Sequence, residues 1–226
     1  KGSICTYGSR LFKGVKSTQT DNFVKRLEEL GFIIMGRTNT PEFGFKTVSD
    51  ATLHGPVRNA VNLERNAGGS SGGAAAVVAS GITPIAAASD GGGSIRIPAS
   101  HNGLIGLKPS RGRVIVGPGS YRGWNGATVH FAMTKTVQDT RNLLFHMQEC
   151  QMGSPFPLPK LSYEQLYKTE IIKPLRVAVL LQSPVGEAVS KDSVDAVMKI
   201  AHFFENHGHS VTLLQKDPVD GIALQK

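Results

Sequence analysis

Cysteine is scarce in this sequence: only Cys5 and Cys150 occur among 226 residues. Two cysteines so far apart make neither a disulfide framework nor the closely spaced pairs of a zinc site. The group His202, His207 and His209 falls at the end of an expected helix, where polar or cationic side chains suit the helix dipole. We therefore expect no bound metal and no cofactor.

Long apolar runs are also missing. No stretch approaches the roughly 20 apolar residues that a membrane-spanning helix needs. The N-terminus lacks the basic and then apolar pattern of a secretory leader. The sequence therefore predicts a cytoplasmic protein that does not enter a membrane.

Aromatic residues make up only 7% of the chain, whereas the formal net charge is +8. The densest basic group is Lys108, Arg111 and Arg113, and no aromatic residues that could stack on bases interleave with it. We interpret the positive charge as a solvated surface, or as one part of a larger protein whose acidic residues lie elsewhere. A nucleic-acid partner is not favoured.

The composition is otherwise that of a folded protein, with 40% hydrophobic and 19% charged residues. Thr20-Asp21 and Gly31 are placed to begin and end a helix, and Thr136 is placed to cap another. The other elements expected in this part are a buried strand over 32–37, a helix of small residues over 72–80, strands over 84–89 and 114–116, and the capped helix over 137–150.

The C-terminal part has a clearer pattern. A strand over 175–181, a helix over 192–207 and a strand over 210–214 follow one another, which predicts a parallel crossover and an α/β fold. We expect three segments: a core over 1–150, a proline-rich linker or excursion over 151–173, and a β-α-β segment of the same domain over 174–226.

Two glycine-serine runs, GGSSGG at 68–73 and GGGS at 91–94, raise the question of function. A phosphate-binding P-loop would need a lysine where Ala74 stands, and a dinucleotide fingerprint would need a strand before Gly68. A Gly-x-Ser-x-Gly nucleophile elbow would need the same strand. A flexible linker does not fit either, because the first run leads directly into apolar core sequence.

The remaining interpretation uses both runs together. Ser94 follows an apolar strand and three glycines, whose backbone N–H groups can converge on one point. This is the requirement for an oxyanion hole, so Ser94 is a candidate nucleophile. A serine hydroxyl needs another group to take its proton before it attacks.

The stretch from 68 to 100, GGSSGGAAAVVASGITPIAAASDGGGSIRIPAS, resembles the amidase signature. The segments over 36–44, 55–59, 103–114 and 133–139 are similar to segments of the same family, and the resemblance covers about residues 7–218. DGGGSIRIPAS looks most like the hydrolases of 6-aminohexanoate cyclic dimers. The resemblance implies a mixed central sheet covered by helices on both faces.

The family uses a Ser–cis-Ser–Lys triad, so the resemblance implies a role for each matched residue. These roles are a nucleophile at Ser94, a cis-serine relay at Ser70, an oxyanion hole at Gly91, Gly92 and Gly93, and supporting residues at Ser71, Asp90 and Arg96, with Ser71 orienting Ser70. In such a site a buried neutral lysine takes a proton from Ser70, which takes one from Ser94. Ser94 then attacks the amide carbonyl, and water releases the acyl group.

The family's lysine lies in an apolar segment ahead of a Gly-Ser pair, and Gly8-Ser9 is similar to that pair. Lys1 is too close to it and lacks the apolar lead-in. We therefore expect the chain to be a fragment without the lysine and the C-terminal part, and we expect it not to turn over amides alone.

The resemblance implies hydrolysis of a small or linear carboxamide, and it leaves a homodimer open. One alternative is the glutaminase subunit of a tRNA-dependent amidotransferase, which commonly has a polar residue where Ile97 stands. The other is an inactive fragment that acts only as a binding module.

Overall fold

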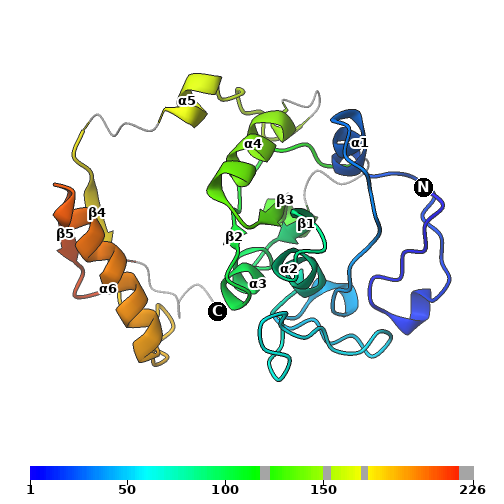
Figure 1. Cartoon of the computed structure of the whole chain (residues 1–226), viewed down its shortest axis with the longest axis horizontal. Coiled ribbons are helices and arrows are strands. Elements are labelled where there is room, and N and C mark those ends of the chain that lie inside the picture. The colour runs from blue at the N-terminus through cyan, green and yellow to red at the C-terminus, as the bar shows by residue number, and fades with distance from the viewer. Residues whose placement is uncertain (118–122, 150–153, 169–172, 219–226) are drawn as a thin grey trace. The chain divides into compact units, whose positions relative to one another are not determined.

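The computed structural model describes residues 1–117, 123–149, 154–168 and 173–218 (Figure 1). The chain forms two compact units, Lys1–Lys168 and Thr169–Lys226. Within the described ranges, no helix combines the length and apolar character needed to cross a membrane.

A small antiparallel sheet lies at the centre of the first unit. Its strands are β1 (Ile85–Asp90), β2 (Ile105–Gly106) and β3 (Val129–Thr134), in the order β1-β3-β2. The register pairs Ile85 with Thr134 and Asp90 with Val129. Strand β1 confirms the strand expected over 84–89, whereas β3 was not anticipated from the sequence. The pairing brings Asp90, at the end of β1, to the edge that leads into the glycine run.

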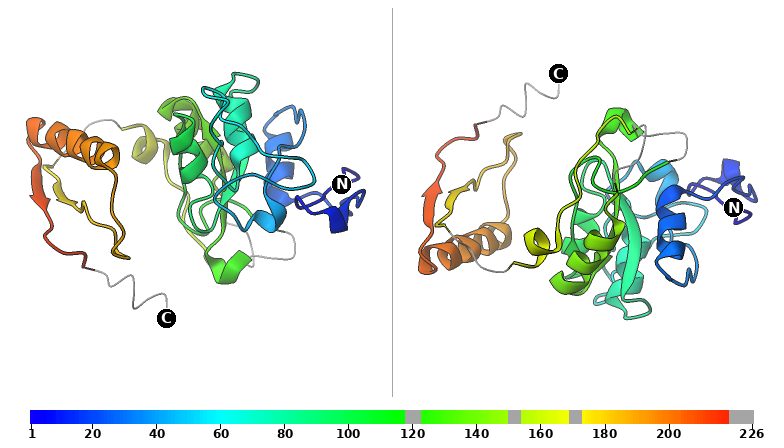
Figure 2. Two further views of the ribbon diagram at one scale, coloured as in Figure 1. Left: turned by 90° about the horizontal axis from the view of Figure 1, so that it is seen from below. Right: turned by 90° about the horizontal axis from the view of Figure 1, so that it is seen from above.

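Helices cover the two faces of this sheet. They are α1 (Asn22–Glu29), α2 (Gly72–Ala79), α3 (Arg96–His101), α4 (Val137–Met147) and α5 (Tyr163–Tyr167), with 3-10 turns η1 (Arg10–Phe12), η2 (Glu42–Gly44) and η3 (Gly123–Gly126). Figure 2 shows α2 on one side of the sheet and α4 on the other. Neighbouring residues of β3 that point to opposite faces, such as Phe131 and Ala132, are both buried.

The helix starts follow local capping rules. The side chain of Asp21 accepts from the amide of Phe23, and the side chain of Thr136 accepts from the amide of Asp139. Both caps confirm the expectation from the sequence. The helix expected to run to residue 150 ends at Met147, and Cys150 lies outside the described residues.

The core of the first unit joins α1, α2, α3, α4 and β3. Helix α2 contributes the fully buried Ala74 and Ala75, whose small side chains let its backbone pack closely against the sheet. The other buried members are Phe23, Leu27, Ile95, Ala99, Val114, Phe131, Ala132, Met133, Leu143 and Met147.

Two strands expected from the sequence are absent. Residues 32–37 form no strand, and their apolar side chains are largely exposed, with Ile33 at 89% and Met35 at 74%. An apolar run forms a strand only where a partner strand meets its backbone, and the described residues supply none there. Residues 114–116 make only an isolated bridge, between Val114 and Gln148.

Residues 154–168 lie along the first unit. The side-chain amide of Gln148 donates to the carbonyl of Leu161 and accepts from its amide, at 2.8 and 2.7 Å. Ser162 and Gln165 then form a reciprocal capping box that begins α5. A single buried glutamine therefore anchors this segment.

The second unit is a strand-helix-strand unit. Strands β4 (Arg176–Val179) and β5 (Ser210–Leu213) are parallel and are joined through α6 (Lys191–Asn206). Ser190 caps α6 through the amide of Ser193. The parallel crossover expected from the sequence is confirmed.

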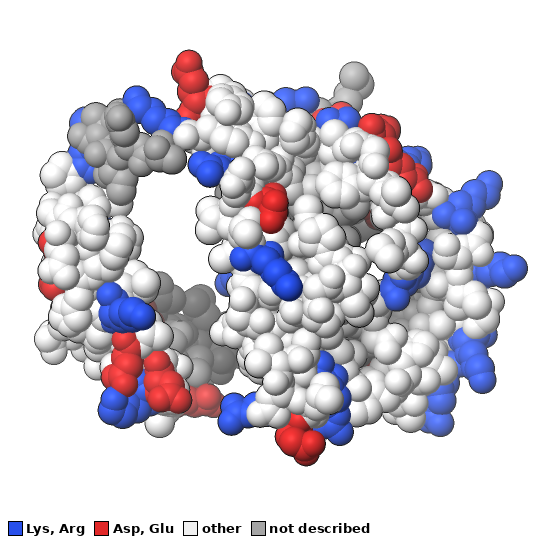
Figure 3. Space-filling model, in the orientation of Figure 1, with Lys and Arg blue, Asp and Glu red and all other residues white. Residues whose placement is uncertain are grey.

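Charged side chains lie on the surface. Figure 3 shows lysine and arginine side chains projecting around the N-terminal segment at the right edge. In this segment Arg10, Lys13 and Lys16 are exposed. This distribution agrees with the interpretation of the positive charge as solvated surface.

Candidate active site

The two glycine-serine runs meet at the end of β1. The amide of Ser71 donates to the carbonyl oxygen of Ser94, at an N–O distance of 3.3 Å. Ser71 immediately precedes α2, and Ser94 lies just before α3. Because β1 connects the two helices, the chain returns and places the serine-bearing turns side by side.

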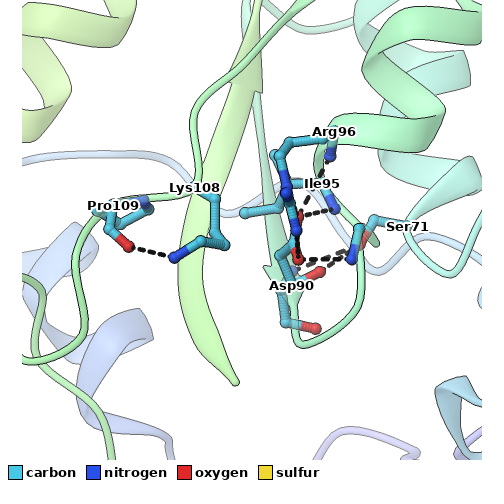
Figure 4. A network of polar contacts seen from close by, with 8 residues as sticks. Ser71, Asp90, Ile95, Arg96, Lys108 and Pro109 are labelled. Carbon is cyan, nitrogen blue, oxygen red and sulfur yellow. Dashed lines mark hydrogen bonds and ion pairs between the residues drawn. The ribbon is translucent and has the colours of Figure 1, made fainter. Parts of the chain in front are cut away.

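Asp90 organises the loop that carries Ser94 (Figure 4). Its fully buried carboxylate accepts from the amides of Gly93 (2.7 Å), Ile95 (3.1 Å) and Arg96 (3.4 Å). The guanidinium of Arg96 closes the loop with two further bonds of 2.9 Å, from Nε to Oδ2 and from NH2 to Oδ1. The backbone on both sides of Ser94 is therefore held by one carboxylate.

Asp90 stays ionised in this position. Burial alone would raise its pKa, but hydrogen bonds from Arg96, Ile95 and Gly93, together with the Arg96 charge, lower the pKa to about 2. The ion pair with Arg96 in turn raises the pKa of that guanidinium. A carboxyl group with so low a pKa does not exchange protons near neutral pH, so Asp90 is suited to support the loop rather than to act as an acid or base.

The glycine amides differ in their availability. The amide of Gly93 is engaged by Asp90, and its φ of 122° with the side chain of Ile97 nearby leaves no room for a Cβ atom. Among the described residues, no acceptor contacts the amides of Gly91, Gly92 or Ser94. The oxyanion hole expected at all three glycines is therefore narrowed to donors other than Gly93.

Ser70 is buried, with 6% of its surface exposed, and the peptide bond between Gly69 and Ser70 is cis. This geometry agrees with the cis-serine expected at this position. Its hydroxyl has no hydrogen-bond partner among the described residues. Its carbonyl oxygen accepts from Ser49 Oγ at 3.0 Å, and Ser49 Oγ accepts from the amide of Gly72 at 3.0 Å.

Ser49 was missed from the sequence, where it is one of several serines in an irregular polar segment. The sequence assigned the orientation of Ser70 to Ser71, and the structure corrects this. Ser71 Oγ bonds the backbone of Ser89 instead, donating to its carbonyl (3.3 Å) and accepting from its amide (3.4 Å). Ser71 fastens the turn to β1, and Ser49 fixes the backbone of Ser70.

The glycines of GGSSGG allow close packing of backbone. A Cβ on Gly73 would lie 2.5 Å from the backbone nitrogen and oxygen of Asn39, and one on Gly72 would lie 2.6 Å from Ser49 Oγ. Real Cβ atoms do not come so close, so both positions require glycine. The run is therefore a packed turn at the start of α2.

A base for Ser70 is not found among the lysines of the described residues, since none donates a hydrogen bond to its hydroxyl. Lys108 lies near the Asp90 network in Figure 4, but its ammonium donates to the carbonyl of Pro109 at 3.0 Å. The described part of the chain also contains no group of three or more His, Cys, Asp or Glu side chains that could hold a metal ion.

Comparisons with known proteins agree with this site. A family model described as Amidase matches residues 1–222. A lipoamidase from Enterococcus faecalis is 41% identical over 226 residues, which is 100% of this chain and 29% of that protein. A 6-aminohexanoate-cyclic-dimer hydrolase from Paenarthrobacter ureafaciens is 37% identical over 203 residues, covering 88% of this chain and 41% of that protein.

Solved structures show the same relationship. The structure of 6-aminohexanoate cyclic dimer hydrolase complexed with substrate has a TM-score of 0.88 and 34% identity, and it covers 95% of this chain and 46% of that chain. A glutamyl-tRNA(Gln) amidotransferase chain from Thermotoga maritima has a TM-score of 0.80 and 27% identity, covering 94% and 47%. The chain thus spans less than half the length of these relatives.

Proposed function

Since this chain belongs to the amidase family and has its α/β fold, we propose that it carries the nucleophile half of an amide hydrolase. The site supports Ser94 as the residue that forms the acyl-enzyme with a small or linear carboxamide. Relatives named amidase, lipoamidase and cyclic-dimer hydrolase support the reaction class.

The observation that carries this proposal is the fixed loop around Ser94. Asp90 and Arg96 hold the residues on both sides of it, and the amides of Gly91 and Gly92 have no acceptor among the described residues. Amides that are held in place can stabilise the oxyanion that forms when the hydroxyl attacks a carbonyl carbon. A loop that had to reorganise during the reaction would lose much of this stabilisation.

Ser70 is the proposed proton relay. Its hydroxyl is buried and lacks a partner among the described residues, while Ser49 fixes its backbone. We propose that a lysine outside residues 1–226 takes the proton from Ser70. Ser70 then takes the Ser94 proton and returns it to the leaving amine, and water releases the acyl group along the same route.

The glutaminase subunit of a tRNA-dependent amidotransferase is the second candidate. The structural likeness to the glutamyl-tRNA(Gln) amidotransferase chain supports it. The likeness to the cyclic-dimer hydrolase is greater in both TM-score and identity, so simple amide hydrolysis is favoured. Co-purification with partner proteins of an amidotransferase complex would favour the second candidate.

Covalent labelling tests the nucleophile. A fluorophosphonate joins the Ser94 oxygen to phosphorus and releases fluoride and a proton, and the intact mass of the protein rises accordingly. We expect an adduct that forms slowly in residues 1–226, that is lost in Ser94→Ala, and that persists in the matched control Ser100→Ala, since Ser100 is exposed. An adduct of unchanged yield in Ser94→Ala would overturn the assignment.

Turnover tests the source of the base. Residues 1–226 alone are expected not to hydrolyse hexanamide. Steady hydrolysis by this chain, abolished by Ser94→Ala, would show that the base lies within it.

A further inference from the structure

We propose that Phe45 and Trp124 form a subsite for the apolar acyl group of the substrate; this rests on the proposed function of Ser94. The two rings stack, with centroids 5.4 Å apart and planes 14° apart. They come from separate parts of the chain, Phe45 just after η2 and Trp124 within η3. The fold therefore brings together two aromatic side chains that are distant in sequence.

Trp124 lies directly against the glycine loop. A Cβ placed on Gly91 would be 2.8 Å from Cε3 and 3.0 Å from Cζ3 of the indole. The ring therefore covers the backbone of Gly91, whose amide has no acceptor among the described residues. A carbonyl group held at that amide would lie beside the indole.

Phe45 is connected to the other serine. It follows Gly44, and a Cβ on Gly44 would lie 3.7 Å from Ser70 Oγ. The stacked pair thus links the turn beside the Ser70 hydroxyl to the loop that precedes Ser94. The two rings form one aromatic wall next to both proposed catalytic serines.

Both rings remain open to a ligand. Phe45 is 69% exposed and Trp124 is 52% exposed, although large aromatic side chains contribute most when they are buried. The backbone of Trp124 and Asn125 is held at φ values of 50° and 54°, in the left-handed region that non-glycine residues rarely adopt. An exposed ring on a constrained backbone fits a surface that is completed when a substrate binds.

The wall favours an uncharged partner. Lys46, the residue after Phe45, pairs with Asp50 at 3.2 Å, and Arg111, which approaches Gly126, lies over the ring of Phe156 at 4.5 Å. These charges are engaged away from the stacked pair. The acyl group that fits is therefore apolar and either flat or extended, because such groups make the largest contact with an aromatic face.

Trp124 is the single tryptophan of the chain, so its fluorescence reports directly on the subsite. The experiment titrates the Ser94→Ala variant of the chain, which cannot form an acyl-enzyme, with hexanamide, phenylacetamide and acetamide. We expect a saturable change in the emission of Trp124 with the first two amides and at least tenfold weaker binding of acetamide. A stronger response to phenylacetamide than to hexanamide would identify a flat acyl group, and the reverse an extended one.

Phe45→Ala in the same background is expected to weaken hexanamide binding about five- to tenfold. The matched control is Phe203→Ala, which removes a 54% exposed aromatic ring from the second unit and should leave binding unchanged. Phe45→Leu keeps an apolar side chain but removes the stacked ring, and it serves if the alanine variant does not fold. Equal binding of acetamide and hexanamide, or equal effects at positions 45 and 203, would overturn the subsite.

The labelling of Ser94 separates this proposal from the function on which it rests. Labelling without a fluorescence response refutes the subsite and leaves the nucleophile. A fluorescence response without labelling supports the subsite and refutes the nucleophile.

Discussion

The backbone amide of Ser71 donates to the carbonyl oxygen of Ser94 at 3.3 Å. This contact joins the turn that begins α2 to the loop that begins α3. The Ser71 hydroxyl also binds the backbone of Ser89 on β1. One residue thereby ties both glycine-serine runs to the strand between them, and the relative position of Ser70 and Ser94 depends on it.

Asp90→Asn is expected to destabilise the chain by about 2–4 kcal/mol. The substitution removes a charge that a buried carboxylate shares with Arg96, and it puts an amide donor where the backbone also donates. Urea unfolding of the variant and the wild type measures the difference. Glu29→Gln is the control, since its ion pair with Arg26 is exposed and should contribute less than about 1 kcal/mol.

Acid should weaken the fold through Asp90. Its pKa is about 2 in the folded chain and 3.8 as an ordinary aspartate, so the unfolded chain binds the proton first as the pH falls. This contribution is complete above pH 4 and is lost between pH 4 and pH 2, with a slope of at most about 1.4 kcal/mol per pH unit. The slope in this window should be smaller in Asp90→Asn, and an unchanged slope would contradict the role of Asp90.

His130 should act at higher pH. Burial lowers its pKa, and the charge of Asp21 opposes this only in part. Because the folded histidine takes up its proton later than the unfolded one, its contribution is complete above about pH 6.5 and is lost as the pH falls below it. Thermal unfolding of His130→Gln between pH 7 and pH 5 should show a weaker pH dependence than the wild type. His202→Gln, an exposed site on α6, serves as the control.

Ser49→Ala should disturb Ser70 without touching either proposed catalytic side chain. It leaves the carbonyl of Ser70 and the amide of Gly72 without their shared partner, which costs about 1–3 kcal/mol of stability. We also expect fluorophosphonate labelling at Ser94 to slow several-fold under conditions where the variant is fully folded. Labelling at the wild-type rate in the folded variant would reduce Ser49 to a purely structural residue.

Gly73→Ala and Gly92→Ala form a matched pair within the two runs. The first Cβ would lie 2.5 Å from backbone atoms of Asn39, whereas the second meets no atom within 4 Å. Gly73→Ala should therefore cost about 1–3 kcal/mol or prevent folding, and Gly92→Ala should change stability by less than about 0.5 kcal/mol. Chemical denaturation distinguishes the two, and similar losses would contradict the close approach at Gly73.

The sequence by itself determined the features that depend on near neighbours. Asp21 and Thr136 cap their helices through amides two or three residues ahead, so the pattern contains the whole interaction. The alternation of β4, α6 and β5 likewise predicted a parallel crossover. The two glycine-serine runs were sufficient to indicate Ser70 and Ser94.

Only the tertiary structure decided which groups meet across the chain. Apolar residues 32–37 read as a strand but are exposed, because composition does not reveal whether a partner strand is present. Ser49 reaches Ser70, and Phe45 stacks on Trp124, through contacts that no local spacing encodes. Likewise, three successive glycines look equivalent in sequence, but the Asp90 carboxylate engages only the amide of Gly93, since hydrogen bonding depends on position and direction in space.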